Sequence, residues 1–281
     1  MSRFSMSRFL IATVFLLSLS ACASIERIAL PKSALLSDAF AVRAVEQTAR
    51  VNYAAYDQFL EHYWVMDENG IARLRYNAVS ESDQAILVAF VDHLQSTDPD
   101  TLDRDERLAY WINLYNAQTI RVVLENYPVD SIRDIKDGPF SIGPWGRKDL
   151  VINGTEISLN DIEHGIIRPA FQEPRIHYAL NCAAASCPNL APQAWKAEGL
   201  DAAFDAAERA YLADPRGVHV DEEGRIVASK IFIWFQEDFG ENAADVAARL
   251  AAIAPAPTGA AIAARGRIDR YEYDWSLNEQ R

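Results

Sequence analysis

Apolar residues at helical spacing run through most of the chain. The strongest such run covers residues 103–126, where an acidic first turn suits the positive end of a helix dipole and Pro128 closes the segment. Its apolar side chains wrap much of the helix circumference, which predicts a central buried helix. Further helices are predicted over residues 37–65, 80–95, 159–171, 200–212 and 230–240, and residues 241–264 are predicted to continue helically with a proline-containing break at 255–257.

Short β-rich stretches lie between these helices. Residues 70–79 and 175–181 are predicted to be extended, and Asn153-Gly154 predicts a tight hairpin with a type I′ turn. A second hairpin is predicted over residues 217–229, and a last strand is predicted within residues 266–278.

The predicted helices and strands interleave without a clear linker. We therefore predict an α+β fold, with a single domain over residues 37–281 whose helices surround a small mixed or antiparallel sheet. A cysteine-peptidase or transglutaminase-like arrangement is compatible with this reading. The chain has 281 residues, of which 50% are hydrophobic, and these values indicate a globular protein with a substantial core.

The first residues of the chain have a different character. Arg3 and Arg8 accompany a short apolar stretch, residues 9–21, which is too short to span a bilayer comfortably. We predict a signal peptide over residues 1–21. The alternatives are a signal peptide that is cut elsewhere and an anchor that is not cut.

The signal ends in a lipoprotein pattern. The sequence LSAC at residues 19–22 places Cys22 directly behind two small residues, which predicts lipidation of this cysteine and a short tether over residues 22–36. The next residue is Ala23 rather than aspartate, and by resemblance to Gram-negative lipoproteins this favours the outer membrane. The predicted location is therefore the outer membrane, with the protein facing the periplasm.

The charge of the chain limits its partners. Without the signal, 25 basic residues stand against 40 acidic ones, which gives a formal charge of −15. Such a surface repels phosphate polyanions, so no nucleic acid is expected as a partner. The predicted partners are a membrane, reached through the N-terminal lipid, and a small-molecule or peptide substrate.

Two asparagines, Asn113 and Asn116, lie in the predicted central helix, where asparagine has poor propensity. Amides that bond neighbouring backbone are the favoured interpretation, because buried polar groups normally find structural partners. The alternative is that they shape a site, and Asn116 is kept as a substrate-binding candidate. Arg168 and Arg175 are further candidates, since a guanidinium can hold a substrate carboxylate.

The chemistry-bearing stretch is HYALNCAAASCPNL, residues 177–190, which holds every cysteine of the chain except Cys22. Ser186 is a natural N-cap, followed by a proline that suits a first helical turn. A helix starting there would place Cys187 beside unpaired backbone N–H groups, which stabilise a thiolate and an oxyanion. Cys182 lies near the end of the predicted strand.

A nucleophilic Cys187 would need a base and a group that orients it. His177 and His164 are the candidate bases, with Glu163 or Asp274 to orient them. This constellation suits acyl transfer, which means hydrolysis of a peptide or amide, or transfer to an amine.

Three other roles for the two cysteines remain open. Outside the cytoplasm, a Cys182–Cys187 disulfide is a natural expectation, provided that the intervening residues turn back. With His164 and His177 the cysteines could supply four zinc ligands, but the Cys-x4-Cys spacing lies outside the commonest zinc-finger spacings, so no metal or other cofactor is predicted. Each cysteine could also be a small buried hydrophobic residue.

Five blocks in order resemble the domain-of-unknown-function family 547. They are LAYWINLYNA (108–117), SLNDIEHGIIR (158–168), RIHYALNCAAASCPNL (175–190), ASKIFIWFQEDFG (228–240) and YDWSLN (273–278). The resemblance covers about residues 50–278, and it departs at Ala183, where the family more often has glycine. Fusion of some eukaryotic relatives to glutaredoxin-like domains implies a thiol theme, and the family's activity is not established.

The sequence thus leaves three functions from different classes. The first is a cell-envelope thiol-dependent hydrolase or acyltransferase that acts on a peptide-like small substrate, with Cys187 as nucleophile and His177 as base. The second is a thiol–disulfide redox protein that uses Cys182 and Cys187. The third is an envelope binding module without catalysis.

Overall fold

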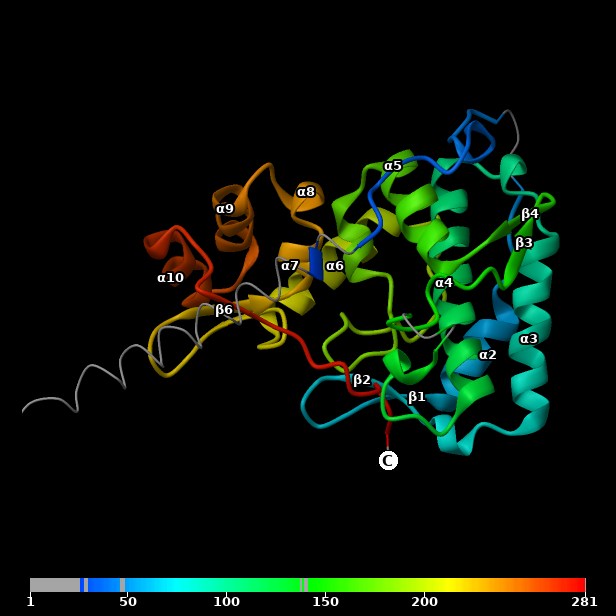
Figure 1. The fold of residues 1–281 in the computed structure, drawn as a ribbon, viewed down its shortest axis with the longest axis horizontal. Coiled ribbons are helices and arrows are strands. Elements are labelled where there is room, and N and C mark those ends of the chain that lie inside the picture. The colour runs from blue at the N-terminus through cyan, green and yellow to red at the C-terminus, as the bar shows by residue number, and fades with distance from the viewer. Residues whose placement is uncertain (1–25, 28–29, 46–48, 137, 139–140, 281) are drawn as a thin grey trace, which may run out of the picture. The chain divides into compact units, whose positions relative to one another are not determined.

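The computed structural model describes residues 26–27, 30–45, 49–136, 138 and 141–280 (Figure 1). The predicted signal peptide and Cys22 lie outside these residues. The described residues form two compact units, one from residues 26–31 with 212–273 and the other from residues 32–211 with 274–280. The α+β class is confirmed. The predicted boundaries of signal, tether and domain stay predictions.

The larger unit is built around α4 (Arg104–Asn126). The side chain of Asp103 accepts the backbone N–H of Glu106 at 2.9 Å and caps this helix, and Trp111 in its middle is fully buried. Figure 1 shows α3 (Glu81–Ser96) running alongside α4, and α2 (Ala54–Tyr63) packs on α3. The predicted central buried helix is therefore confirmed.

Two short hairpins complete the regular structure of the larger unit, together with α5 (Arg168–Phe171) and α6 (Leu200–Ala213). The hairpins are antiparallel and consist of β1 (Trp64–Met66) with β2 (Ala72–Leu74), and β3 (Leu150–Ile152) with β4 (Thr155–Ile157). In the second hairpin, Asn153 and Gly154 have φ values of 47° and 76°, as the predicted type I′ turn requires.

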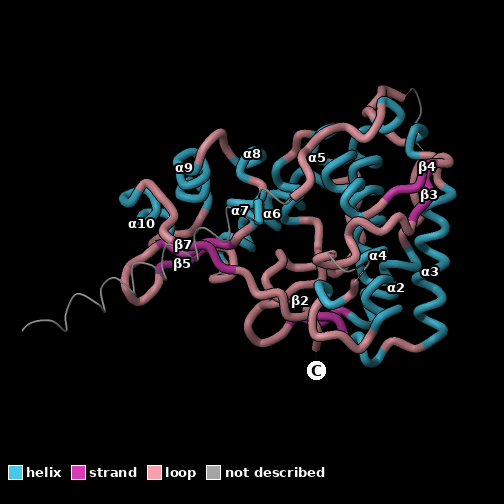
Figure 2. The backbone as a smooth tube through the Cα atoms, in the orientation of Figure 1, coloured by secondary structure: helices cyan, strands magenta, loops and turns pink. Residues whose placement is uncertain are grey.

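The smaller unit contains a mixed three-stranded sheet in the order β5-β6-β7 (Figure 2). The strands are β5 (Val218–Val220), β6 (Ile226–Ser229) and β7 (Arg270–Glu272), and β6 pairs antiparallel with β5 and parallel with β7. Its helices are α7 (Ile231–Trp234), α8 (Gln236–Phe239), α9 (Ala243–Ile253) and α10 (Thr258–Arg265). The predicted hairpin over 217–229 and the last strand are confirmed.

Some predicted elements are wrong. The long helix predicted over residues 37–65 is a short 3-10 turn at Asp38–Phe40 and then α2, with residues 46–48 outside the described part. The predicted strand at 175–181 is a 3-10 helix, Pro174–Tyr178, because the Glu173 side chain accepts the N–H of Arg175 and starts a turn. No helix among the described residues is both long and apolar enough to cross a bilayer.

Candidate functional site

A π-helix over Asp161–Ile167 carries two of the predicted site residues, Glu163 and His164, and both are buried. One cause of its form is local. Pro169 has no N–H to donate, and the N–H of Arg168 bonds the carbonyl of Glu163 five residues back. π-helices are rare and occur frequently at functional sites, which marks this segment as more than packing.

The carbonyls that this arrangement frees are bonded by an extended segment of the chain. The carbonyl of His164 accepts the N–H of Ala34 at 3.1 Å, and the carbonyl of Gly165 accepts the N–H of Leu36 at 2.7 Å. A Cβ added at Gly165 would lie 3.2 Å from the Cβ of Leu36, so glycine allows this close approach. Backbone pairing therefore holds the π-helix in place, and its side chains remain available for other contacts.

The structure brings Glu163 and His177 together. The Nδ1 atom of His177 lies 3.8 Å from Oε1 of Glu163, within ion-pairing distance, and both side chains are almost entirely buried. His164 has a different partner, because its Nδ1 lies 3.0 Å from Nη1 of Arg168. A guanidinium can only donate, so this contact requires an unprotonated Nδ1 and places the proton of a neutral His164 on Nε2.

Cys182 and Cys187 form a disulfide, with their Cα atoms 6.4 Å apart. The two cysteine residues differ in burial, since Cys187 is 3% exposed and Cys182 is only partly buried. The backbone N–H of Cys182 donates to Sγ of Cys187 at 3.0 Å. The disulfide expected from the compartment is therefore present, and the residues between the cysteines do turn back.

The helix predicted to start at Ser186 is absent, so that prediction is wrong. The hydroxyl of Ser186 accepts the N–H of Asp274 at 2.7 Å instead of capping a helix, and its carbonyl accepts the hydroxyl of Tyr211 at 2.8 Å. Cys187 consequently does not lie at a helix N-terminus. Asp274, predicted as an orienting carboxylate, meets this loop through its backbone.

The disulfide loop pairs with the C-terminal segment, residues 274–278. The N–H of Ala185 donates to Ser276, the N–H of Ser186 to Asp274, and Ala183 accepts the N–H of Asn278, at 2.7, 3.1 and 3.0 Å. Ala183 has φ 61°, a left-handed conformation that favours glycine, which explains why glycine suits this position.

The two asparagines of α4 bond neighbouring backbone, as favoured from the sequence. Asn116 donates to the carbonyl of Ala179 at 2.9 Å and accepts the N–H of Asn181 at 2.8 Å. Asn113 makes the same pair of bonds to the backbone of Trp195, at 2.8 and 2.9 Å. Asn116 thus anchors the segment between His177 and Cys182 to the central helix, and its substrate contact stays a prediction.

The two candidate arginines are engaged within the protein. Arg175 forms ion pairs of 2.6 to 2.7 Å with Glu173, Asp201 and Asp205, and the hydrogen bond with Glu173 is the largest cause of its raised pKa. Arg168 is 5% exposed and contacts His164. Binding of a substrate carboxylate by either arginine remains a prediction.

One residue of this loop was missed from the sequence, namely Asn181. Its side chain bonds the backbone of Ala183 and of Pro188 and also the side chain of Asn278. The sequence did offer a signal for it, because Asn181 directly precedes Cys182, the first cysteine of the possible disulfide ring. Asparagine side chains in loops commonly bond nearby backbone.

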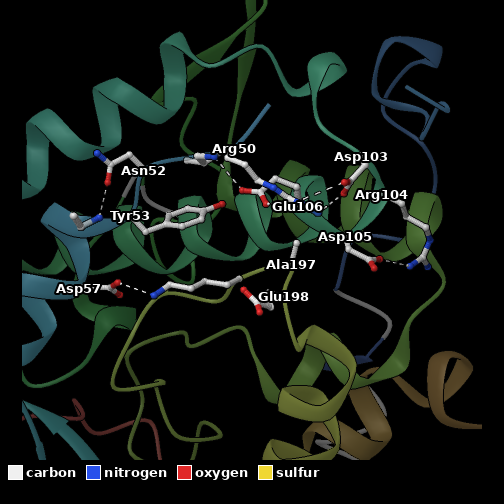
Figure 3. Close-up of a pocket in the computed structure, with 13 residues that line it drawn as sticks. Arg50, Asn52, Tyr53, Asp57, Asp103, Arg104, Asp105, Glu106, Ala197 and Glu198 are labelled. Atoms are coloured by element: carbon white, nitrogen blue, oxygen red, sulfur yellow. Dashed lines mark hydrogen bonds and ion pairs between the residues drawn. The ribbon is translucent and has the colours of Figure 1, made fainter. Parts of the chain in front are cut away.

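A cavity of about 920 Å³, also not foreseen from the sequence, lies at the start of α4 (Figure 3). Its lining includes Tyr53 and two charged pairs, Arg50 with Glu106 at 2.7 Å and Lys196 with Asp57 at 3.1 Å. These charges neutralise one another. Within the described part of the chain, no three or more His, Cys, Asp or Glu side chains are grouped to hold a metal ion.

Comparison with known proteins finds a match to a family model and no match to an individual protein. Residues 99–212 match the family model described as "Protein of unknown function, DUF547". This match supports the family that the sequence resembles. The matched range contains α4, the π-helix, His177 and the disulfide. No curated protein and no solved structure matches the chain, so the likeness to cysteine peptidases or transglutaminases stays a prediction.

Proposed function

We propose that this chain is a thiol–disulfide redox protein of the bacterial cell envelope, in which Cys182 and Cys187 cycle between disulfide and dithiol. The observation that carries the proposal is the asymmetry of the pair. Cys182 is the more exposed residue, whereas Cys187 is buried and its sulfur receives the Cys182 N–H at 3.0 Å. A hydrogen bond to the departing thiolate stabilises its negative charge and makes it the better leaving group.

The exchange follows from this asymmetry. A substrate thiolate attacks Sγ of Cys182 and forms a mixed disulfide, and the electron pair of the broken S–S bond leaves on Cys187. A second substrate thiolate then attacks the substrate sulfur, which releases the substrate disulfide and the Cys182 thiolate. Both protein thiolates take up the protons that the substrate thiols lost. A disulfide co-substrate of the oxidising envelope restores the Cys182–Cys187 bond by the reverse exchange.

Counting thiols before and after reduction tests the proposal. The full chain is alkylated with and without prior treatment with glutathione, and the modified residues are located by mass spectrometry. We expect no alkylation at Cys182 and Cys187 at first, alkylation of both after mild reduction, and recovery of the disulfide when glutathione disulfide is added. If glutathione does not reduce the disulfide, the redox function is rejected. The disulfide would then have a structural role in a binding module.

A thiol-dependent hydrolase or acyltransferase is the second candidate, favoured by the pairing of Glu163 with His177 beside the π-helix. It requires one indispensable cysteine in the reduced protein. A peptide-like electrophile should then label Cys187 alone, and His177→Ala should change the pH dependence of labelling between about pH 5 and 9. Equal dependence on both cysteines favours the redox function instead.

The envelope location has its own test at Cys22. We expect the N-terminal peptide of the mature protein to begin at Cys22 and to carry acyl chains, since a lipid anchor holds a protein at the membrane without a spanning helix. Mass spectrometry of that peptide from a Gram-negative host measures this. Cys22→Ser should yield no lipidated peptide, whereas Cys182→Ser should leave lipidation unchanged. An unmodified Cys22, or a mature N-terminus elsewhere, contradicts the prediction.

A further inference from the structure

We propose that Asn181 is a positioning residue that holds the reduced cysteines ready to close. Its amide oxygen accepts the N–H of Ala183 at 3.0 Å, and its amide nitrogen donates to the carbonyl of Pro188 at 2.9 Å. Ala183 follows Cys182 and Pro188 follows Cys187, so one side chain ties the chain at both ends of the disulfide ring. This inference rests on the proposed redox function.

The Asn181 side chain with its bonds to Ala183 and Pro188, called the clamp below, is itself held in place by two other segments. The backbone N–H of Asn181 bonds the side chain of Asn116 in α4 at 2.8 Å, and its amide oxygen also accepts Asn278 of the C-terminal segment at 3.3 Å. Asn181 is 5% exposed, so water competes little for these bonds. None of these contacts involves a sulfur atom. They therefore persist when the disulfide opens.

The consequence for the redox equilibrium is directional. With the clamp in place, the dithiol loop gains little freedom on reduction, and the sulfurs keep a high effective concentration toward each other. Without the clamp, the reduced loop gains conformational freedom that the bonded ring cannot gain. Loss of Asn181 should therefore shift the equilibrium toward the dithiol, by about tenfold in the ratio of oxidised to reduced protein.

The test compares Asn181→Ala with Asn113→Ala in the full chain. Asn113 is the matched control, because it is also a buried amide bonded to backbone on both sides, but its partner is Trp195 rather than the ring. Both variants are equilibrated in buffers that differ in the ratio of oxidised to reduced dithiothreitol. They are then quenched with acid and alkylated, and their intact masses are measured. We expect the midpoint ratio of Asn181→Ala to move about tenfold toward the dithiol, with that of Asn113→Ala within twofold of wild type.

Equal shifts in the two variants, or no shift in Asn181→Ala, overturn the proposal. If Asn181→Ala does not fold, Asn181→Asp replaces it, since it retains the oxygen that faces Ala183 and loses the donor to Pro188. The midpoint ratio of Asn181→Asp is then expected to move in the same direction, toward the dithiol, by less than about tenfold. The dithiothreitol equilibrium measures ring closure alone, so a failure of the proposed function, seen as no exchange with glutathione in wild type, remains distinguishable from a failure of the clamp.

Discussion

Replacing Cys187 with serine is expected to convert the protein into a trap that holds a mixed disulfide at Cys182. The variant keeps the more exposed cysteine and lacks the thiol that would expel a bound substrate thiol. Replacing Cys182 with serine leaves only Cys187, a residue that is 3% exposed, so a reagent reaches its sulfur slowly. Both changes abolish dithiol–disulfide cycling, but only the first gives a stable adduct.

Reaction with an aromatic disulfide reagent measures this asymmetry. The rate at which the coloured thiol is released should be at least about tenfold higher for Cys187→Ser than for Cys182→Ser, because the accessibility of the remaining cysteine limits exchange. Intact mass then shows an adduct on Cys182. Equal rates, or a faster Cys182→Ser, would falsify the assignment of Cys182 as the attacked sulfur. The double variant controls for reagent that binds without reacting.

The local signals in the sequence were sufficient for the elements that depend on neighbouring residues. Asp103 and Pro128 bound the central helix, and Asn153-Gly154 selects its hairpin turn without help from the rest of the chain. The disulfide was also foreseeable, but only from the predicted compartment and the number of cysteines. Its geometry depends on a turn that the residues between the cysteines do not predict.

The features that were missed depend on residues far away in the sequence. Ser186 has the chemistry of an N-cap, but its hydroxyl is taken by the N–H of Asp274, so no helix begins there. The π-helix needs Pro169 and also the backbone of Ala34 and Leu36, which a local pattern cannot bring together. Tertiary hydrogen bonds therefore determine both the cysteine loop and the Glu163 side of the site.

A separate pair of hydrogen bonds ties the loop to α4, and Asn116 makes both of them. We expect Asn116→Leu to lower the free energy of unfolding by about 2–5 kcal/mol, because the carbonyl of Ala179 and the N–H of Asn181 would both be left buried and unpaired. Leucine has the same branching and the same number of side-chain heavy atoms, so the substitution leaves no cavity and the loss of hydrogen bonds is the main effect. Denaturation in urea, monitored by tryptophan fluorescence, measures the change.

Gln118 on the same helix is the matched control. It is 1% exposed, its amide oxygen has no hydrogen-bond partner among the described residues, and its nitrogen reaches Asp149 only at 3.4 Å. Gln118→Leu therefore removes a poorly satisfied buried amide, and it should change the free energy of unfolding by less than about 1 kcal/mol or increase it. If both variants are equally destabilised, burial of leucine in α4 rather than the Asn116 bonds explains the effect. If only Asn116→Leu is destabilised, the disulfide loop owes its position to the central helix, and its rate of reduction by dithiothreitol should rise in the same variant.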